Sequence, residues 1–308
     1  MLAHETWFTD ARAEFDWSFA LAPASLIVIA AAVAVAIAWR LVGGRLPRPE
    51  LPFLRPIGRL VPWIPRLLAV HAGVSLLAQA ARGTYLAPSL DLPETPFGVA
   101  LRILEGVIGV WLISGYRIRW VALIVAASGP IAMLAYGVVP VLERMDLLGI
   151  ALFLYVLPPG PDRWGQARED PDATAAALLW LRLLTGAALI LLAFTEKLAR
   201  PALARAFLDD YPAFNILETL GLDVGDDVFI RLAAAVELLF GLLIVSGRLP
   251  QATVIAAGIP FNATLFFLGA EELIGHLPVY GAMLALLVYG SNDGTALLTD
   301  RFPGVAAP

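Results

Sequence analysis

Apolar residues run almost without interruption along this chain, and short breaks rich in proline, glycine and charge separate the runs. Most runs approach the roughly 20 residues that a helix needs to cross a bilayer. The pattern therefore predicts nine transmembrane helices, with boundaries that can move by about 2–4 residues. They cover residues 20–42, 62–81, 97–116, 120–137, 141–158, 175–195, 228–246, 250–270 and 276–291. The fold class that we expect is all-α, a polytopic membrane protein.

Composition supports this class and narrows the chemistry. Of the 308 residues, 59% are hydrophobic and only 15% are charged, which is more apolar surface than a soluble domain needs. The N-terminal residues are acidic and lack the basic start of a signal peptide, so the first apolar run is expected to remain as a transmembrane helix. The net charge is −5 and the basic residues gather in loops, a pattern without a nucleic-acid footprint.

The chain contains no cysteine and three histidines, His4, His71 and His276. The absence of cysteine excludes disulfides, thiolate metal sites and an intrinsic dithiol redox cycle. We therefore expect no metal site and no covalent cofactor. Any redox chemistry requires a bound organic cofactor, such as a quinone, or a partner subunit.

The distribution of basic residues predicts the orientation. If the N-terminus lies outside, twelve arginines face the cytoplasm: Arg40, Arg45, Arg48, Arg55, Arg59, Arg66, Arg117, Arg119, Arg163, Arg168, Arg248 and Arg301. Six basic residues then face the other side: Arg12, Arg82, Arg144, Lys197, Arg200 and Arg205. We expect a protein of the bacterial inner membrane with its C-terminus in the cytoplasm.

One apolar phrase occurs twice. EGVIGVWLISG begins at Glu105 and ELLFGLLIVSG at Glu237, a shift of 132 residues that also superimposes Gly109 on Gly241. A carboxylate deep in an apolar helix costs roughly 2.5–3.5 kcal/mol to insert, so its presence in both copies indicates a function or a fixed partner. The phrase predicts a duplicated membrane unit.

The remaining spans follow the same duplication. Arg66-Leu-Leu and Arg182-Leu-Leu are related by a shift of 116, so the second unit has sixteen extra residues before its glutamate helix. Four crossings return each unit to its starting side, which predicts two parallel-repeat four-helix bundles plus one N-terminal helix. The expected divisions are 1–60 (helix and basic loop), 61–160 (first unit), 161–176 (linker), 177–294 (second unit) and 295–308 (tail). The polar segment 198–227 is expected to form short helices over the outer face of the second unit.

The second unit resembles a known family. Arg182 opens its first helix, Lys197 and Pro201 follow the far end, Glu237 begins the repeated phrase, and HLPVYGAMLALLVYGSNDG begins at His276. Together these features resemble the DoxX family. The first unit keeps Arg66 and the glutamate phrase but lacks the other two motifs, as expected of a diverged copy.

The resemblance implies a four-helix membrane fold like that of the small, DoxD-type subunit of thiosulfate:quinone oxidoreductase. Other relatives are regarded as membrane anchors in redox or oxidative-stress complexes. No catalytic residues are transferred, because none are agreed for the family.

The two glutamates have a functional and a structural interpretation. Each lies near the bilayer midplane, where a carboxylate can take a proton or bind a ligand. Each can instead bond to a neighbouring helix and fix the bundle. Arg102 lies three residues before Glu105 and predicts a structural ion pair there, whereas Glu237 has no such neighbour and is the preferred catalytic candidate.

His276, Tyr280 and Asn262 are candidate ligand or quinone contacts, together with Glu105. His276 is expected to open the last helix with Tyr280 one turn below it, an arrangement that also suits an interfacial polar cap. Asn262 follows the kinking Pro260 and can line a cavity or fill the gap in the helix.

Three basic residues are candidate contacts for an anion or lipid head groups: Arg66, Arg182 and Lys197. The two arginines suit a snorkelling position near the cytoplasmic boundary, and the equivalence of their positions also allows a shared packing role. The mixed charges around Lys197 fit an ordinary solvated loop as well as an anion site.

The leading hypothesis is a membrane component of a quinone-linked redox system, in sulfur oxidation or oxidative stress, with a redox partner subunit. Whether the chain is itself an enzyme stays open. The alternatives are a transporter or lipophilic-ligand-binding protein and a purely structural scaffold. The sequence leaves the substrate and the oligomeric state undetermined.

Overall fold

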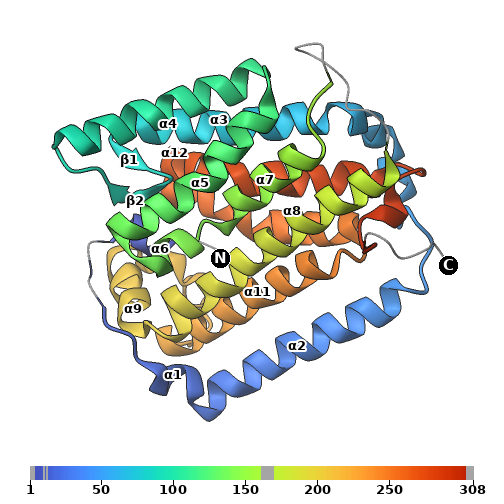
Figure 1. The fold of residues 1–308 in the computed structure, drawn as a ribbon. Coiled ribbons are helices and arrows are strands. Elements are labelled where there is room, and N and C mark those ends of the chain that lie inside the picture. The colour runs from blue at the N-terminus through green and yellow to red at the C-terminus, as the bar shows by residue number, and fades with distance from the viewer. Residues whose placement is uncertain (1–3, 10, 12, 161–169, 303–308) are drawn as a thin grey trace.

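The computed structural model describes residues 4–9, 11, 13–160 and 170–302, and this part of the chain is almost entirely helical (Figure 1). Within it, seven helices are long and apolar enough to cross a membrane. They are α2 (Pro23–Gly43), η2 with α3 (Pro52–Trp63 and Ile64–Arg82), α4 (Pro96–Ser114), α5 (Ile118–Tyr136), α8 with η3 (Pro171–Leu192 and Ala193–Leu198), α11 (Asp226–Ser246) and α12 (Pro250–Ser291). An all-α, multi-pass membrane protein is confirmed at this level.

The other elements are short. They are η1 (Glu5–Trp7), α1 (Trp17–Leu21), β1 (Thr84–Tyr85), β2 (Ala87–Asp91), α6 (Val138–Leu142), α7 (Met145–Val156), α9 (Pro201–Asp210), η4 (Pro212–Phe214), α10 (Ile216–Thr219) and η5 (Ala296–Leu298). The sequence did not predict the antiparallel hairpin β1–β2, whereas short helices were expected over 198–227. Arg12, Arg163, Arg168 and most of the predicted linker and tail (161–169 and 303–308) lie outside the described residues.

Helix α12 consists of two arms joined at a bend. Gly269 between them has φ 67° and ψ −143°, outside the helical region and open mainly to glycine. The arms correspond to the expected spans 250–270 and 276–291, but the second arm begins earlier than predicted. His276 therefore lies inside this arm and not at its start, which corrects the expected position.

Glycine ends the two glutamate helices in the same way. Gly115 after α4 and Gly247 after α11 both adopt left-handed backbone, with φ 77° and 64°. A glycine in this conformation is a common stop signal of helices. The repeated Ser-Gly pair is thus the C-terminal boundary of each glutamate helix.

The long helices pack side by side. In the first half, α3 lies against α4 and α5 against α7, and in the second half α8 lies against α11. Contacts between α7 and α8 and between α3 and α12 join the halves. Helix α2 packs on α11 at the edge of the bundle (Figure 1).

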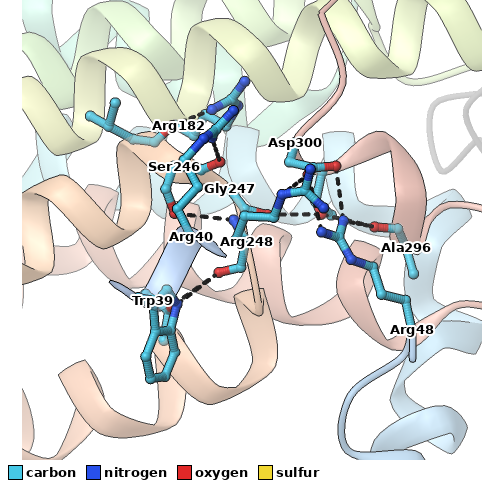
Figure 2. Close-up of polar contacts among 12 residues, drawn as sticks. Trp39, Arg40, Arg48, Arg182, Ser246, Gly247, Arg248, Ala296 and Asp300 are labelled. Atoms are coloured by element: carbon cyan, nitrogen blue, oxygen red, sulfur yellow. Dashed lines mark hydrogen bonds and ion pairs between the residues drawn. The ribbon is translucent and has the colours of Figure 1, made fainter. Parts of the chain in front are cut away.

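The two ends of the bundle differ in what covers them. We call the end that carries η1, the β1–β2 hairpin and α9 the capped end. Helices α2 and α11 end at the opposite end, where Arg40, Arg48, Arg182 and Arg248 gather, and we call it the arginine-rich end; Figure 2 shows these four side chains. Because α4 and α11 both run from the capped end to the arginine-rich end, the two repeated glutamates belong to the same side of the bundle.

Candidate functional site

A buried ionic cluster lies at the capped end of the second half. Glu237 on α11 has its Oε2 atom 3.1 Å from Nζ of Lys197, and the same Nζ lies 3.6 Å from Oε1 of Glu5. All three side chains are at most 6% exposed. One lysine is therefore shared between two carboxyl groups away from solvent.

A π-helical turn places the lysine there. Element η3 continues α8 with the wider i→i+5 bonding, and Thr195, Glu196 and Lys197 are all buried in it. Such turns are rare and frequent at functional sites, because they redirect side chains that an α-helix would place on different faces. The turn presents Glu196 and Lys197 to the cluster together.

The N-terminal segment closes this cluster from outside. The backbone N–H of Glu5 donates to Oε2 of Glu196 at 2.8 Å, and the Thr6 hydroxyl donates to Oε1 at 2.6 Å. His4 Nδ1 lies 3.6 Å from the same carboxylate. A void of about 10 Å³ remains beside Glu5 and Lys197. Glu196 is thus the anchor on which η1 docks.

Trp7 holds the segment in place. Its ring stacks on His4 with centroids 3.8 Å apart and lies 5.0 Å from the ring of His276. It also packs directly on Gly275, where an added Cβ would lie 2.1 Å from the indole. Only glycine leaves room for this ring.

The cluster extends to charged groups from both halves. His276 Nδ1 lies 3.3 Å from Glu272, and Arg144 is 3.5 Å from Asp146 with its guanidinium over the Trp7 ring. Glu143 accepts from the Thr195 hydroxyl at 2.6 Å, and Arg200 lies 3.4 Å from it. The cluster therefore contains chains of neighbouring titratable groups.

Burial shifts the pKa values of the docking segment. Burial raises the pKa of Glu5 to about 8, although Lys197 opposes the shift. Burial also lowers the pKa of His4 to about 4, against the attraction of Glu196. Both shifts favour the uncharged forms of η1 side chains in the docked state.

The first-half glutamate has a simpler environment. Glu105 is 1% exposed, and its Oε1 accepts the backbone N–H of Leu86 in the β1–β2 hairpin at 2.6 Å. The hairpin itself is fixed by Thr84, whose hydroxyl donates to Gln79 at 2.7 Å. Glu105 thus fixes the hairpin by a hydrogen bond, which agrees with the structural interpretation of the repeated glutamate.

Two sequence predictions about these glutamates are wrong. Arg102 does not pair with Glu105; its guanidinium donates to the carbonyls of Ala80 and Ala81 at 2.6 and 2.8 Å. Glu237 is not unpaired, because Lys197 is its partner. The reason is that helix–helix packing brought the lysine to Glu237, whereas the unpaired carbonyls at the end of α3 attracted Arg102.

The remaining ligand candidates are only partly brought together. His276 joins the cluster and is 2% exposed. Tyr280 lies near it, but its hydroxyl donates to the Phe261 carbonyl at 3.1 Å. Asn262 is exposed and donates to the Gly258 carbonyl, four residues earlier in the same helix, at 2.7 Å. Its side chain therefore does not line the cluster.

Arg66 and Arg182 do not snorkel. They are 8% and 1% exposed, and their guanidinium groups donate to helix-end carbonyls: Arg66 to those of Leu112 and Ile113, and Arg182 to that of Val245. Lys197 is likewise buried in its ion pairs, so both expectations for it, contact with an anion or head groups and an ordinary solvated loop, are wrong.

The sequence did not identify four of the acids in the cluster, Glu5, Glu143, Glu196 and Glu272. The only signal was the Glu196-Lys197 pair at the end of an apolar run, since ionisable residues at such a position need partners. Among the described residues, no group of three or more His, Asp or Glu side chains is arranged to hold a metal ion. The chemistry of these side chains suits ion pairing and the uptake or release of protons.

Comparison with known proteins does not assign the chain. No family model, no curated protein and no solved structure matches it.

Proposed function

We propose that the chain crosses the membrane nine times and consists of two four-helix units in tandem. The nine spans are the long helices with α12 counted as two arms, plus α7. Two equivalent contacts support the repeat. Arg66 donates to the carbonyl of Ile113, and Arg182 donates to that of Val245, which are related by the same shift of 132 residues.

The close helix crossing is also common to both units. An added Cβ on Gly109 would lie 2.8 Å from the carbonyl oxygen of Gly73, and one on Gly241 would lie 2.8 Å from that of Gly186. Backbones approach this closely only where small residues face each other. Each glutamate helix therefore packs closely on the first helix of its unit through a pair of glycines, with the facing glycines Gly73 and Gly186 related by a shift of 113 residues.

We propose further that the protein is a DoxX-like membrane component of a quinone-linked redox system, and that its second unit exchanges protons. One observation carries this function: the buried Glu5–Lys197–Glu237 group beside the Glu196–His4 and His276–Glu272 pairs. Such ionisable groups are costly within a membrane protein and are functional candidates for that reason. A scaffold needs no such concentration of charge.

The shared lysine gives the cluster a simple response to a proton. When Glu237 takes a proton, it loses its charge attraction to Lys197, and the carboxyl group of Glu5, 3.6 Å from the same Nζ, remains as a polar partner of the lysine. The net charge of the trio rises by one while its geometry is held by the anchor at Glu196. Glu237 is thus the proton acceptor in this proposal, and Lys197 and Glu5 balance its charge.

A quinone ring does not fit in this cluster. The space beside Glu5 and Lys197 is about 10 Å³, room for roughly one water molecule. The Tyr280 hydroxyl already donates its hydrogen bond to the Phe261 carbonyl. We therefore assign the quinone and the electron transfer to the partner subunit, and to this chain only the protonation of Glu237.

For location, we propose the bacterial inner membrane with the capped end outside. The positive charge of the arginine-rich end supports this orientation under the positive-inside rule. The N-terminus would then be external and the C-terminus cytoplasmic.

The test is quinone-linked turnover of the protein purified with its native partners. Glu237→Gln is expected to lower turnover with a short-chain quinone about 10²-fold, the lower range for a lost general acid or base. Glu105→Gln is the matched control and is expected to leave turnover within about twofold. Absence of any quinone-dependent activity, or equal losses in both variants, would refute the proposal.

A lipophilic-ligand-binding function is the second candidate. It is favoured by an apolar cavity of about 190 Å³ between α5 and α7, lined among others by Val125, Gly129 and Met133. Gly129 has room for a larger side chain, since an added Cβ would lie 3.9 Å from Val141. This function predicts that Gly129→Leu abolishes binding of a lipophile, whereas the redox proposal predicts normal turnover in that variant.

A further inference from the structure

Four arginines from different segments converge at the arginine-rich end (Figure 2). Arg40 comes from the last turn of α2, Arg48 from the loop after it, Arg182 from α8 and Arg248 from the connection between α11 and α12. Because these segments are far apart in sequence, the convergence is a product of the fold.

In the part of the chain that the structure describes, the carboxylate that pairs with these arginines is Asp300. Asp300 accepts two hydrogen bonds from Arg48, at 2.8 and 3.0 Å, and also pairs with Arg248. The nearby Glu50 is engaged elsewhere, accepting the backbone N–H groups of Gln251 and Ala252 at the start of α12. The network therefore carries an excess of positive charge.

Among the described residues, the two arginines that Asp300 does not bind donate their hydrogen bonds to carbonyls, and Arg182 also lies over the Phe302 ring, 5.3 Å from its centroid. Arg40 donates to the Ser246 carbonyl at 3.2 Å, and Arg182 donates to that of Val245. These carbonyls end α11, whose dipole offsets part of one charge. Burial lowers the pKa of Arg248 despite the attraction of Asp300, and Arg48 and Arg40 lower that pKa further, as expected of crowded like charges. An anion from outside would relieve this excess.

The position favours a membrane lipid as its source. Arg40 is exposed, and Ile37 and Leu41 beside it on α2 are 56% and 66% exposed, on a helix long and apolar enough to span the membrane. Trp39 lies at the same level and donates from its indole to the Arg248 carbonyl at 3.2 Å. Tryptophan at a helix end, next to arginine, is typical of the head-group layer.

We propose that Arg40 and Arg248 bind the phosphate of an anionic phospholipid whose acyl chains lie along α2. Arg48 and Arg182 supply the surrounding positive field, and Asp300 limits it. This site is independent of the proton exchange proposed for the capped end.

Native mass spectrometry of the full chain in detergent tests this site with phosphatidylglycerol and phosphatidylcholine as probes. Arg40→Gln is expected to weaken phosphatidylglycerol binding about fivefold, the effect of one basic residue at an anionic surface. Asp300→Asn is expected to strengthen it, because it removes the internal competitor. Arg117→Gln, at an exposed arginine of the same end, is the matched control and is expected to change little.

Three results would overturn the proposal. Equal losses in Arg40→Gln and Arg117→Gln would mean a diffuse surface effect. Unchanged or weaker lipid binding in a folded Asp300→Asn variant would mean that the arginines only cap α11. Displacement of the lipid by millimolar inorganic phosphate would identify a soluble anion as the ligand.

Discussion

The two halves of this protein present the same glutamate to two different environments. In the first half, Glu105 accepts one backbone N–H from a hairpin. In the second half, Glu237 pairs with a buried lysine that a further carboxylate shares. A segment of the capped end covers each site: the β1–β2 hairpin covers Glu105, and η1 covers Glu237. The two sites differ because η1 carries ionisable side chains, whereas the hairpin offers a backbone N–H. The repeated phrase thus packs closely in both halves, while the neighbouring segments decide which partners its carboxylate has.

The largest expected effect on stability is at Lys197, the partner of Glu237, and it is compared with the effect at Arg102, which lies near Glu105 but does not bind it. Lys197→Met leaves the Glu237 carboxylate and the Glu5 carboxyl group without the cation between them and is expected to lower the free energy of unfolding by about 3–5 kcal/mol. Arg102→Met removes a partly exposed arginine and is expected to cost about 1 kcal/mol or less. Denaturant unfolding in mixed micelles compares the two, and similar losses would mean that the halves do not differ in this way.

The shared packing is tested by glycine substitutions in both halves. Gly109→Ala and Gly241→Ala each force a methyl group against a facing backbone and are expected to cost about 1–3 kcal/mol. Gly106→Ala is the control, because its Cβ would make an ordinary contact of 3.7 Å with Ala80. If only one of these two substitutions lowers the free energy of unfolding, the close helix crossing is not common to both halves.

Docking of η1 is expected to depend on pH, unlike a closure made by backbone alone. For Glu5 the docked pKa of about 8 exceeds the ordinary 4.5, so docking weakens as pH rises towards 8. For His4 the docked pKa of about 4 is below the ordinary 6.5, so docking weakens as pH falls from 6.5 towards 4. The two effects offset each other between pH 4.5 and 6.5, where docking is strongest.

Above pH 6.5 only Glu5 contributes, and the docking equilibrium is expected to fall about tenfold per pH unit, about 2 kcal/mol by pH 8. The fluorescence of Trp7, with Trp7→Phe as the blank, measures it. Glu5→Gln is expected to remove the slope above pH 6.5. A slope that persists in this variant would locate the titrating group elsewhere.

The smallest expected effect is at the first-half glutamate. Glu105→Gln keeps an acceptor for the Leu86 N–H and is expected to change the free energy of unfolding by less than about 1.5 kcal/mol. The same unfolding assay measures it. A loss of unfolding free energy comparable to that of Lys197→Met would contradict this and would indicate that Glu105 has an ionic partner, which is absent from the described contacts.

The sequence predicted an all-helical, multi-pass chain, and the structure has seven long apolar helices in its described part, because hydropathy, proline and Ser-Gly stops act locally. It failed where partners come from distant segments. Arg102 is three residues from Glu105 and still bonds to α3 carbonyls, whereas Lys197 reaches Glu237 across a helix interface. The docking of η1 on Glu196, 191 residues away, left no local pattern at all. Only the cost of burying an ionisable pair at the end of an apolar run pointed to this site.

The central claim is that Glu237, and not Glu105, exchanges a proton during redox turnover. Infrared difference spectroscopy of the protein with its copurified partners, driven by a short-chain quinol, tests it most directly. The account predicts a carboxyl signal in the wild type that persists in Glu105→Gln and disappears in Glu237→Gln. A signal that survives in Glu237→Gln, or one that is lost in Glu105→Gln, would contradict it.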